Sequence, residues 1–368
     1  MQTRKHFVFI SILFFTWAVT VVARLKFNGL SYGFDYGLYQ PDGMHYTFRT
    51  LTFLGKSDQV SAQMVSEWYA THAFKFSQIN PQDLLPENNR VWGVISPRLL
   101  YPILSMPFVA VFGIPGMIAV SAISFLVLLL TVYIIGKKYH QEGFALFIAF
   151  LLTTSVTTTR WMISNCTDAL LVGVTCIAVL ILISGISDNL KLASLSVVSV
   201  LGVVTRFSLP IWLAIAGVLF TYRKIRMALA LIVSASLATI PTYMSQPADA
   251  VLPGTKDLSG LDKLVTLPIS FLKVAFVEIA QLAALDRVLL LFLLASIAIA
   301  ILKVREIENR YFISVAFAVF GIGAINGVFG VNFRYQLPLI PFMAWAVLAF
   351  ASRINFNTDS IRFRSEKP

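Results

Sequence analysis

The sequence predicts an all-α polytopic membrane protein with about ten transmembrane helices, built as a single domain over residues 1–351. Hydrophobic residues make up 57% of the 368-residue chain and charged residues only 13%, and the mean hydropathy is +0.78. Apolar stretches of about 18 residues recur, which is the length that crosses a bilayer as a helix. Short clusters of lysine and arginine separate these stretches, as loops between spans require. These observations exclude a soluble globular domain.

The first expected span covers residues 7–23 and follows the basic triplet Arg4-Lys5-His6. This arrangement also resembles a signal peptide, because Val21-Val22-Ala23 is an acceptable cleavage site. We expect an uncleaved anchor, since the later spans orient consistently only when this helix is counted. The nine further spans that the apolar pattern predicts are 115–135, 144–158, 168–186, 192–204, 209–222, 227–243, 288–302, 311–327 and 335–351.

The basic clusters predict which side of the membrane each loop faces. With the N-terminus in the cytoplasm, all of them lie inside, as the positive-inside rule requires, and both termini are cytoplasmic. The clusters are Lys137-Lys138, Lys191, Arg223-Lys224-Arg226, Lys303-Arg305-Arg310 and the basic tail 352–368. The net charge of +11 thus reflects topology, and no single basic patch indicates nucleic acid as a partner. The modest length and the lack of an obvious eukaryotic retention signal favour a bacterial plasma (inner) membrane.

Two long loops are expected on the outer face, over residues 24–113 and 244–287. The first contains residues 98–112, which are apolar but interrupted by proline. Counting this segment as a crossing would place Lys137-Lys138 outside, so we expect a helix that lies in the membrane interface. The second loop contains residues 263–284, which carry Lys273 and Glu278 on an otherwise apolar stretch and are expected to do the same.

Two aspartates of the first outer loop are candidates for a catalytic base. A carboxylate just outside the membrane can take a proton from an acceptor hydroxyl while that hydroxyl attacks an activated sugar carbon. Asp42 is the first choice and Asp35 the second. The setting Pro41-Asp42-Gly43 is also typical of an ordinary turn, which is the alternative interpretation. His45 and Tyr46 follow closely and are expected to contact substrate or to hydrogen-bond within the site.

A third aspartate, Asp168, is predicted to open a span at its outer end. An ionisable group at that depth is costly and often functional, but an aspartate near a helix N-terminus is also a good cap. Both interpretations are open for Asp168.

Four arginines are predicted at outer helix ends, beside apolar or aromatic neighbours. Guanidinium groups bind phosphate bidentately and stabilise the charge that builds on a phosphate leaving group. These residues are Arg98, Arg160, Arg206 and Arg334, and Tyr335 follows the last of them. The alternative is that each arginine extends its head group to the interface and binds lipid.

The chain has no motif for a soluble nucleotide or a metal. A phosphate-binding loop, a nucleophile elbow and a dinucleotide fingerprint are all lacking, and the four histidines show no metal-ligand spacing. We therefore name no cofactor, and whether a divalent metal takes part is left open.

The order of these parts resembles the GT-C superfamily of polyprenyl-phosphate-dependent glycosyltransferases. An inside-to-outside first helix is followed by Asp42 with Tyr46 four residues on, and then by a proline-containing segment that ends at Phe112-Gly113. The span-opening Asp168 and the late element Arg334-Tyr335-x-x-Pro338-x-x-Pro341 complete a likeness that covers most of the chain.

This resemblance implies an inverting transfer of a sugar from a polyprenyl-phosphate donor to a glycan, lipid or protein acceptor. The loop aspartate, Asp42 here, would act as base or position the acceptor. The basic residues, which correspond to Arg98, Arg206 and Arg334, would hold the lipid phosphate. The chain departs from the family at Gly43, where many members carry glutamate, and this puts a mechanism with an acidic pair or a metal in doubt.

Two other functions remain compatible with the sequence. A lipid-linked glycan polymerase or ligase would use the same outer loop, with an assembled oligosaccharide on its donor. A secondary transporter also has about ten helices with proline interruptions, but we find no paired halves with matching broken helices and few ionisable residues at mid-membrane.

Overall fold

The computed structural model describes residues 2–27, 38–72, 79–89, 92–243, 260–325, 330–331 and 333–354. All regular structure in these ranges is helical, which confirms the predicted all-α class. Within them, four helices are long and apolar enough to cross a membrane, or five if one bent pair is a single span, and six shorter apolar helices accompany them. The fold is therefore compatible with a helical membrane protein, while ten crossings stay a prediction.

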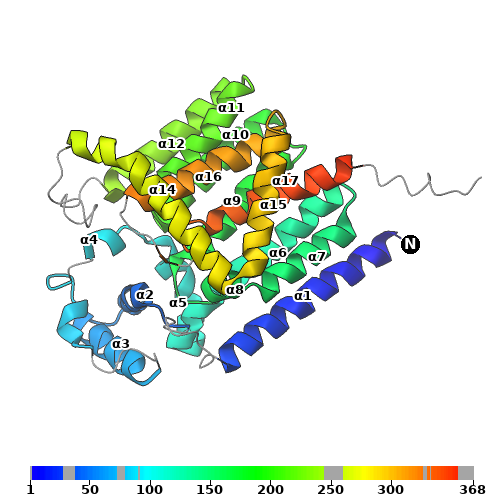
Figure 1. The fold of residues 1–368 in the computed structure, drawn as a ribbon. Coiled ribbons are helices and arrows are strands. Elements are labelled where there is room, and N and C mark those ends of the chain that lie inside the picture. The colour runs from blue at the N-terminus through cyan, green and yellow to red at the C-terminus, as the bar shows by residue number, and fades with distance from the viewer. Residues whose placement is uncertain are drawn as a thin grey trace, which may run out of the picture.

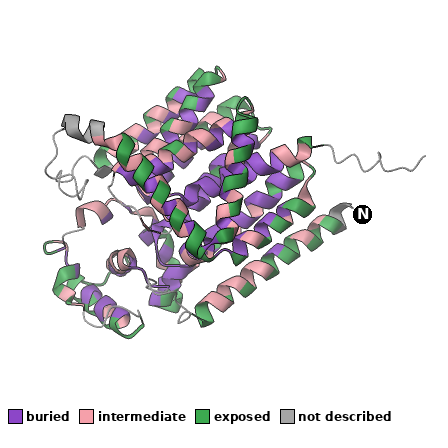
Figure 2. Ribbon diagram, in the orientation of Figure 1, coloured by how far each residue is buried: buried purple, intermediate pink, exposed green. Residues whose placement is uncertain are grey.

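The core of the bundle lies between two groups of helices (Figure 1). One group contains α6 (Ile118–Lys138), α7 (Glu142–Thr154) and α9 (Thr167–Ile183), and the other contains α10 (Asp188–Thr205), α11 (Leu209–Thr221), α12 (Ile225–Tyr243) and α16 (Ile307–Ile325). The C-terminal helix α17 (Ile340–Arg353), preceded by the short η3 (Leu337–Leu339), packs against α6, α9, α15 and α16. Most residues of α9 and α17 are buried, and the exceptions lie mainly towards their C-terminal ends (Figure 2). These two helices therefore form the centre on which the site is built.

The N-terminal helix α1 (Gln2–Lys26) lies along the outside of the bundle, against α6 and α7 (Figure 1). Two side-chain hydrogen bonds attach it to α6. His6 Nδ1 lies 2.8 Å from the Tyr133 hydroxyl, and Trp17 Nε1 donates to the Ala122 carbonyl over 2.8 Å. Most of its apolar side chains are half-buried or exposed, as is typical of a helix that has lipid for its other neighbour.

The expected span 144–158 is not a single helix. It divides at Ser155 into α7 and α8 (Val156–Met162), which are bent by 76° against each other. Ser155 caps α8 by accepting a hydrogen bond from the Thr158 amide over 3.0 Å. The carboxylate of Asp286, remote in sequence, accepts hydrogen bonds from the Ser155 hydroxyl over 2.6 Å and the Thr157 amide over 2.8 Å. The break is therefore stabilised by a non-local contact that hydropathy does not report.

The first long loop folds into a helical lobe at one end of the bundle (Figure 1). Its elements are α2 (Pro41–Phe53), α3 (Asp58–His72), η1 (Pro81–Leu84), α4 (Trp92–Ile95) and α5 (Leu100–Phe112), which leads through η2 (Ile114–Met117) into α6. The expected interfacial helix 98–112 corresponds to α5, and its depth in a membrane stays a prediction.

The second long loop contains α14 (Gly260–Leu285), which leads at Asp286 into α15 (Arg287–Leu302). Residues 266–285 of α14 are long and apolar enough to cross a membrane. In Figure 1, however, α14 runs across the direction that α1, α6 and α7 share, and it ends near α8. Whether α14 lies in the interface stays a prediction. Of the expected tail 352–368, only residues 352–354 are among the described residues.

Candidate active site

Asp42 lies in the first turn of α2, which faces the bundle. Pro41 occupies the first helical position, where its fixed φ suits a helix start, and Gln40 is the N-cap residue. The backbone amide of Gln40 donates a hydrogen bond to Asn165 Oδ1 over 2.8 Å. This bond attaches the start of α2 to the segment before α9. The alternative interpretation of Pro41-Asp42-Gly43 as an isolated turn is therefore wrong, because these residues begin a helix.

The close approach of α2 to Asn165 explains why glycine follows Asp42. A Cβ atom at Gly43 would lie 2.3 Å from the Asn165 carboxamide. Asn165 cannot move aside easily, because its side chain also donates to the Tyr69 hydroxyl and its backbone amide donates to the Leu38 carbonyl over 3.0 Å. A residue with a side chain would therefore not fit at position 43.

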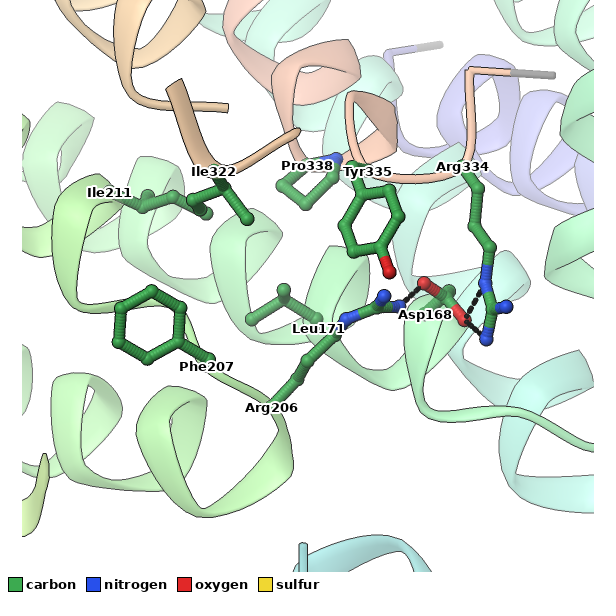
Figure 3. A pocket seen from close by; sticks show the side chains of 9 residues that line it. All are labelled: Asp168, Leu171, Arg206, Phe207, Ile211, Ile322, Arg334, Tyr335 and Pro338. Carbon is green, nitrogen blue, oxygen red and sulfur yellow. Dashed lines mark hydrogen bonds and ion pairs between the residues drawn. The ribbon is translucent and has the colours of Figure 1, made fainter. Parts of the chain in front are cut away.

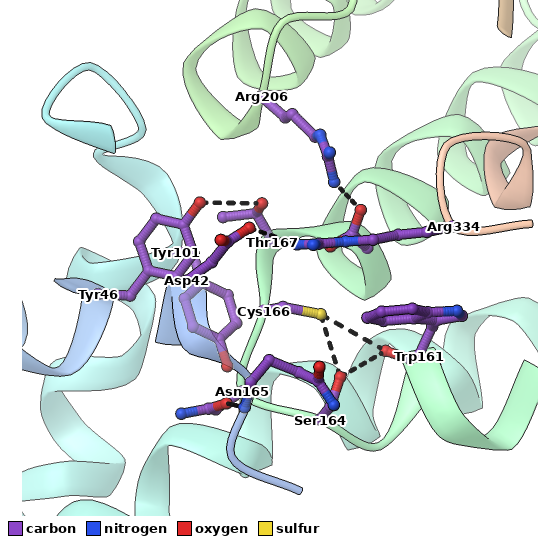
Figure 4. Close-up of polar contacts among 12 residues, drawn as sticks. Asp42, Tyr46, Tyr101, Trp161, Ser164, Asn165, Cys166, Thr167, Arg206 and Arg334 are labelled. Atoms are coloured by element: carbon purple, nitrogen blue, oxygen red, sulfur yellow. Dashed lines mark hydrogen bonds and ion pairs between the residues drawn. The ribbon is translucent and has the colours of Figure 1, made fainter. Parts of the chain in front are cut away.

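Arg334 bridges two of the predicted aspartates, Asp168 (Figure 3) and Asp42 (Figure 4). Its Nη2 atom lies 2.5 Å from Asp42 Oδ2 and 2.9 Å from Asp168 Oδ2, and its Nε atom donates to the same Asp168 oxygen over 2.9 Å. The two carboxylates differ in access, since the Asp42 side chain is 32% exposed and that of Asp168 is 2% exposed. Residues 42, 168 and 334 thus meet in one cluster. The sequence predicted each of them as a site residue but did not predict their contacts.

Asp168 binds a second guanidinium group through its other oxygen. Arg206, which follows the end of α10, forms an ion pair with Asp168 Oδ1 (Figure 3). Asp168 lies in the first turn of α9, where the helix macrodipole also favours a negative charge. Both carboxylate oxygens are engaged by arginine, so these ion pairs, and no cap hydrogen bond, are the described contacts of Asp168. A narrow pocket beside this ion pair is lined by Asp168, Leu171, Arg206, Phe207, Ile211, Ile322, Arg334, Tyr335 and Pro338.

An aromatic ring lies close to the guanidinium group of each of these two arginines, Arg206 and Arg334. The guanidinium carbon of Arg206 lies 4.2 Å from the ring centre of Tyr335, and that of Arg334 lies 4.9 Å from the ring centre of Trp161. Cations are attracted to the faces of such rings, most strongly where water is excluded. Arg160 approaches the same Trp161 ring, with its guanidinium carbon 5.0 Å from the ring centre. Arg160 is therefore a neighbour of the cluster, and none of the described ion pairs that hold Asp42 and Asp168 involves it.

A second buried arginine reaches the site through Tyr46. Arg98 Nη1 donates to the Tyr46 hydroxyl over 2.7 Å, and this hydroxyl lies 3.4 Å from Thr167 Oγ1, next to Asp168. Arg98 and Tyr46 are both buried. The predicted residues from the first loop are thereby linked to the start of α9.

His45 lies one helical turn after Asp42 and on the same side of α2. Its Nδ1 atom lies 2.8 Å from Asn89 Nδ2. Burial lowers the pKa of His45, and the nearby Asp42 carboxylate opposes this in part. His45 is thus placed to hydrogen-bond beside the site.

The charges of the cluster shift the pKa values of its members. Burial would raise the pKa of Asp42, but the guanidinium groups of Arg334, Arg98 and Arg206 together hold it well below its usual range. Burial would lower the pKa of Arg334, yet the Asp42 carboxylate raises it. Asp42 is accordingly a carboxylate in this arrangement, and a weak base for as long as Arg334 binds it.

The described residues contain no group of three or more His, Cys, Asp and Glu side chains that could hold a metal ion. A divalent cation shared by two carboxylates would need both Asp42 and Asp168 as ligands. Arg334 occupies the position between them and supplies the positive charge that both require. The donor set around these aspartates therefore fits a guanidinium better than a metal.

Two outcomes complete the comparison with the sequence. Asp35, the second candidate for the base, lies outside the described residues. Trp161 and Asn165 shape the site but were not predicted, because an aromatic or amide residue beside an apolar stretch carries no local signal of its contacts. The position of Asn165, three residues before Asp168, was the one available hint.

Comparison of the chain with protein-family models, with curated proteins and with solved structures found no match.

Proposed function

We propose that this chain is a membrane glycosyltransferase that moves a sugar from a polyprenyl-phosphate donor to an acceptor hydroxyl at the extracytoplasmic face. The observation that carries the proposal is the bridge of Arg334 between the partly exposed Asp42 and the buried Asp168. It places an accessible carboxylate beside guanidinium groups that suit a phosphate. A proton acceptor and an anion site within one cluster are the two parts that such a transfer requires.

The reaction would follow from these positions. The acceptor oxygen attacks the anomeric carbon of the donor and passes its proton to Asp42, while the bond from that carbon to the phosphate oxygen breaks. The leaving polyprenyl phosphate carries the new negative charge, which Arg334 and Arg206 stabilise. A single displacement of this kind inverts the anomeric centre.

Donor binding would also prepare the base. A phosphate that binds Arg334 competes with Asp42 for the same guanidinium group. Once that ion pair is weakened, the pKa of Asp42 rises towards its usual range and the carboxylate becomes a better proton acceptor. The lowered pKa of Asp42 while it is paired with Arg334 is therefore compatible with a role as base once a donor phosphate binds Arg334.

An apolar groove near the cluster suits the tail of such a donor. It has a volume of about 240 Å³ and is lined by residues of α5, α6 and α9. Leu170 lines the groove, and the next residue, Leu171, lines the pocket that contains Arg206 and Arg334. A lipid whose phosphate binds these arginines could lay its first isoprene units in the groove, where burial of apolar surface is favourable.

The test is turnover of polyprenyl-phosphate sugars by the purified protein with candidate acceptors. We expect Asp42→Asn to lower turnover by roughly a hundredfold or more, the range of losses seen when a catalytic acid or base is removed. The same substitution at the exposed Asp188 is the matched control and should leave turnover unchanged. Full turnover in Asp42→Asn, with loss in Asp35→Asn, would move the base to Asp35 without changing the reaction.

Two results would overturn the reaction class. Uptake of radiolabelled sugar into vesicles, without release of sugar from any lipid carrier, would indicate a transporter. Activity only with donors that carry an assembled oligosaccharide would indicate a polymerase or ligase.

A further inference from the structure

A buried glutamate outside the cluster binds the loop that carries Arg334. Glu278 lies on α14, and its side chain is fully buried. Its Oε1 atom accepts hydrogen bonds from the amides of Gly330 over 2.9 Å and Val331 over 3.0 Å. Its Oε2 atom accepts a hydrogen bond from the Phe333 amide over 2.5 Å. Three backbone donors thus converge on one carboxylate, and the last of them belongs to the residue directly before Arg334.

The loop has a conformation that needs such support. Gly330 has φ +75° and Phe333 has φ +60°, and the second value is unfavourable for a residue with a side chain. Successive backbone amides in conformations of this kind form a concave group of donors that binds an anion. Glu278 supplies that anion from within the protein. The Phe333 ring is fully buried and packs edge-to-face on Phe320, with ring centres 6.3 Å apart.

Glu278 lies on the buried face of α14. The opposite face of α14 is apolar and exposed, as Ile269, Leu272 and Phe276 show with 70%, 67% and 75% of their surface accessible. Glu278 therefore points away from that surface and into the bundle. A buried carboxylate is stable only when it is well hydrogen-bonded, and here the loop amides fulfil that need.

We infer that Glu278 is a positioning residue that directs Arg334 to the anion site, an inference that rests on the proposed function. Fixing the Phe333 amide fixes the start of the next residue, from which the Arg334 side chain reaches Asp42 and Asp168. Loss of the carboxylate releases the loop, and the guanidinium group then no longer faces the phosphate in one orientation. Glu278 itself touches no substrate.

The first test compares the affinities of variants for undecaprenyl phosphate and for undecaprenol in detergent micelles. Glu278→Gln keeps the size of the side chain but turns an NH₂ group towards a backbone donor. We expect it to weaken binding of the phosphate by roughly tenfold and to leave binding of the alcohol unchanged. Glu278→Asp, which keeps the charge with a shorter reach, should lose less, and it replaces Glu278→Gln if that variant does not fold.

The matched control is Glu308→Gln, in the first turn of α16 and at the end of that helix opposite to the loop that carries Arg334. Glu308 is 1% exposed and binds Arg353 over 2.5 Å, so the same substitution removes an equally buried charge. It should lower thermal stability without changing the preference for the phosphate over the alcohol. An equal loss of preference in both variants would show that Glu278 acts only through stability, and would overturn the inference.

A double-mutant comparison tests the route of the effect. If Glu278 acts through Arg334, then adding Glu278→Gln to Arg334→Ala should cause no further loss of affinity for undecaprenyl phosphate. A further loss of roughly tenfold in the double variant would show that Glu278 acts independently, which contradicts the inference.

The last measurement needs no substrate and separates this inference from the proposed function. Glu278→Gln should speed hydrogen exchange at the amides of Gly330, Val331 and Phe333, and should raise the reactivity of Arg334 with phenylglyoxal. If the wild-type protein binds undecaprenyl phosphate no better than undecaprenol, the proposed function fails, while these two signals still report on Glu278. Unchanged exchange and reactivity would overturn the positioning role.

Discussion

The two ends of helix α10 each carry an ion pair, and the surroundings of the two pairs differ. After its C-terminal end Arg206 binds Asp168, and these side chains are 5% and 2% exposed. At its N-terminal end Asp188 binds Lys224 over 2.6 Å, and these side chains are 61% and 47% exposed. The same pairing of opposite charges thus occurs once inside the bundle and once at its surface.

The difference teaches where charge is costly enough to indicate a function. An exposed pair is hydrated on both sides and contributes about 0–1 kcal/mol. A buried pair loses its hydration, and an apolar pair of similar volume is often at least as stable. The chain nevertheless keeps Asp168 between Arg206 and Arg334. Stability alone gives no reason for this arrangement, which is compatible with the proposed anion site.

The largest effect is expected when one partner of the buried ion pair is removed. Asp168→Asn leaves the guanidinium of Arg206 buried without the carboxylate that now compensates it, and a loss of this kind costs about 3–5 kcal/mol. We expect a large drop in the unfolding temperature in detergent and a loss of binding to polyprenyl phosphate. Wild-type stability in Asp168→Asn would show that the pair is well hydrated, contrary to its burial.

The close packing of α2 against Asn165 can be tested with one substitution. Gly43→Ala places a methyl group 2.3 Å from the Asn165 carboxamide, which cannot move without breaking its hydrogen bonds. We expect a destabilisation of about 1–3 kcal/mol, together with reduced activity, because α2 would shift Asp42. Chemical unfolding and turnover measure the two effects.

Gly217→Ala in α11 is the control for this packing test, since nothing lies within 4 Å of a Cβ atom there. In a helix interior this change should be neutral or stabilising by up to about 1 kcal/mol. If both variants lose the same stability, then the contact of Gly43 with Asn165 is not the cause.

Acid titration should reveal the charge of Asp42. Because its pKa is lower in the folded protein than the value of about 4 in an unfolded chain, the carboxylate stabilises the fold at neutral pH. This contribution is lost as the pH falls below about 4 towards the folded-state pKa. Asp42→Asn should therefore be less stable at neutral pH and lose less stability than wild type between about pH 4 and pH 2. Parallel curves of unfolding temperature against pH would contradict the ion pair with Arg334.

The smallest effect is expected at the exposed end of α10. Asp188→Asn removes the surface ion pair with Lys224 and should change stability only slightly, an effect that vanishes at high salt. Unfolding at low and high salt measures it. A loss as large as that of Asp168→Asn would abolish the distinction between the two ends.

Much of the fold was predictable from the sequence because hydropathy is a local property. Most of the long apolar stretches are helical in the structure. The span expected over 168–186, for example, corresponds to α9. The bend between α7 and α8 was not predictable, because it depends on Asp286, about 130 residues further along the chain. The same limit applies to the first outer loop, whose helices pack against residues such as Asn165 that are distant in sequence.

The charged residues of the candidate site could be predicted from the sequence, but the contacts between them could not. Charged residues beside apolar spans are rare enough to stand out, and this identified Asp42, Asp168, Arg206 and Arg334. Nothing local indicates that Arg334 contacts both aspartates, or that Trp161 lies against its guanidinium group. Glu278 was noticed only as a charge in an apolar stretch, and its role appears once the amides of the loop are seen to face it.

The sequence by itself therefore determined the helical class and the positions of the charged groups beside the apolar segments. Composition and apolar length are properties of each segment separately. The tertiary structure decided which charges meet, which of them are shielded from water and which glycine has no room for a side chain. Those properties depend on contacts between segments up to 292 positions apart, as between Asp42 and Arg334, and the energy of a charge depends on the surroundings that such contacts create.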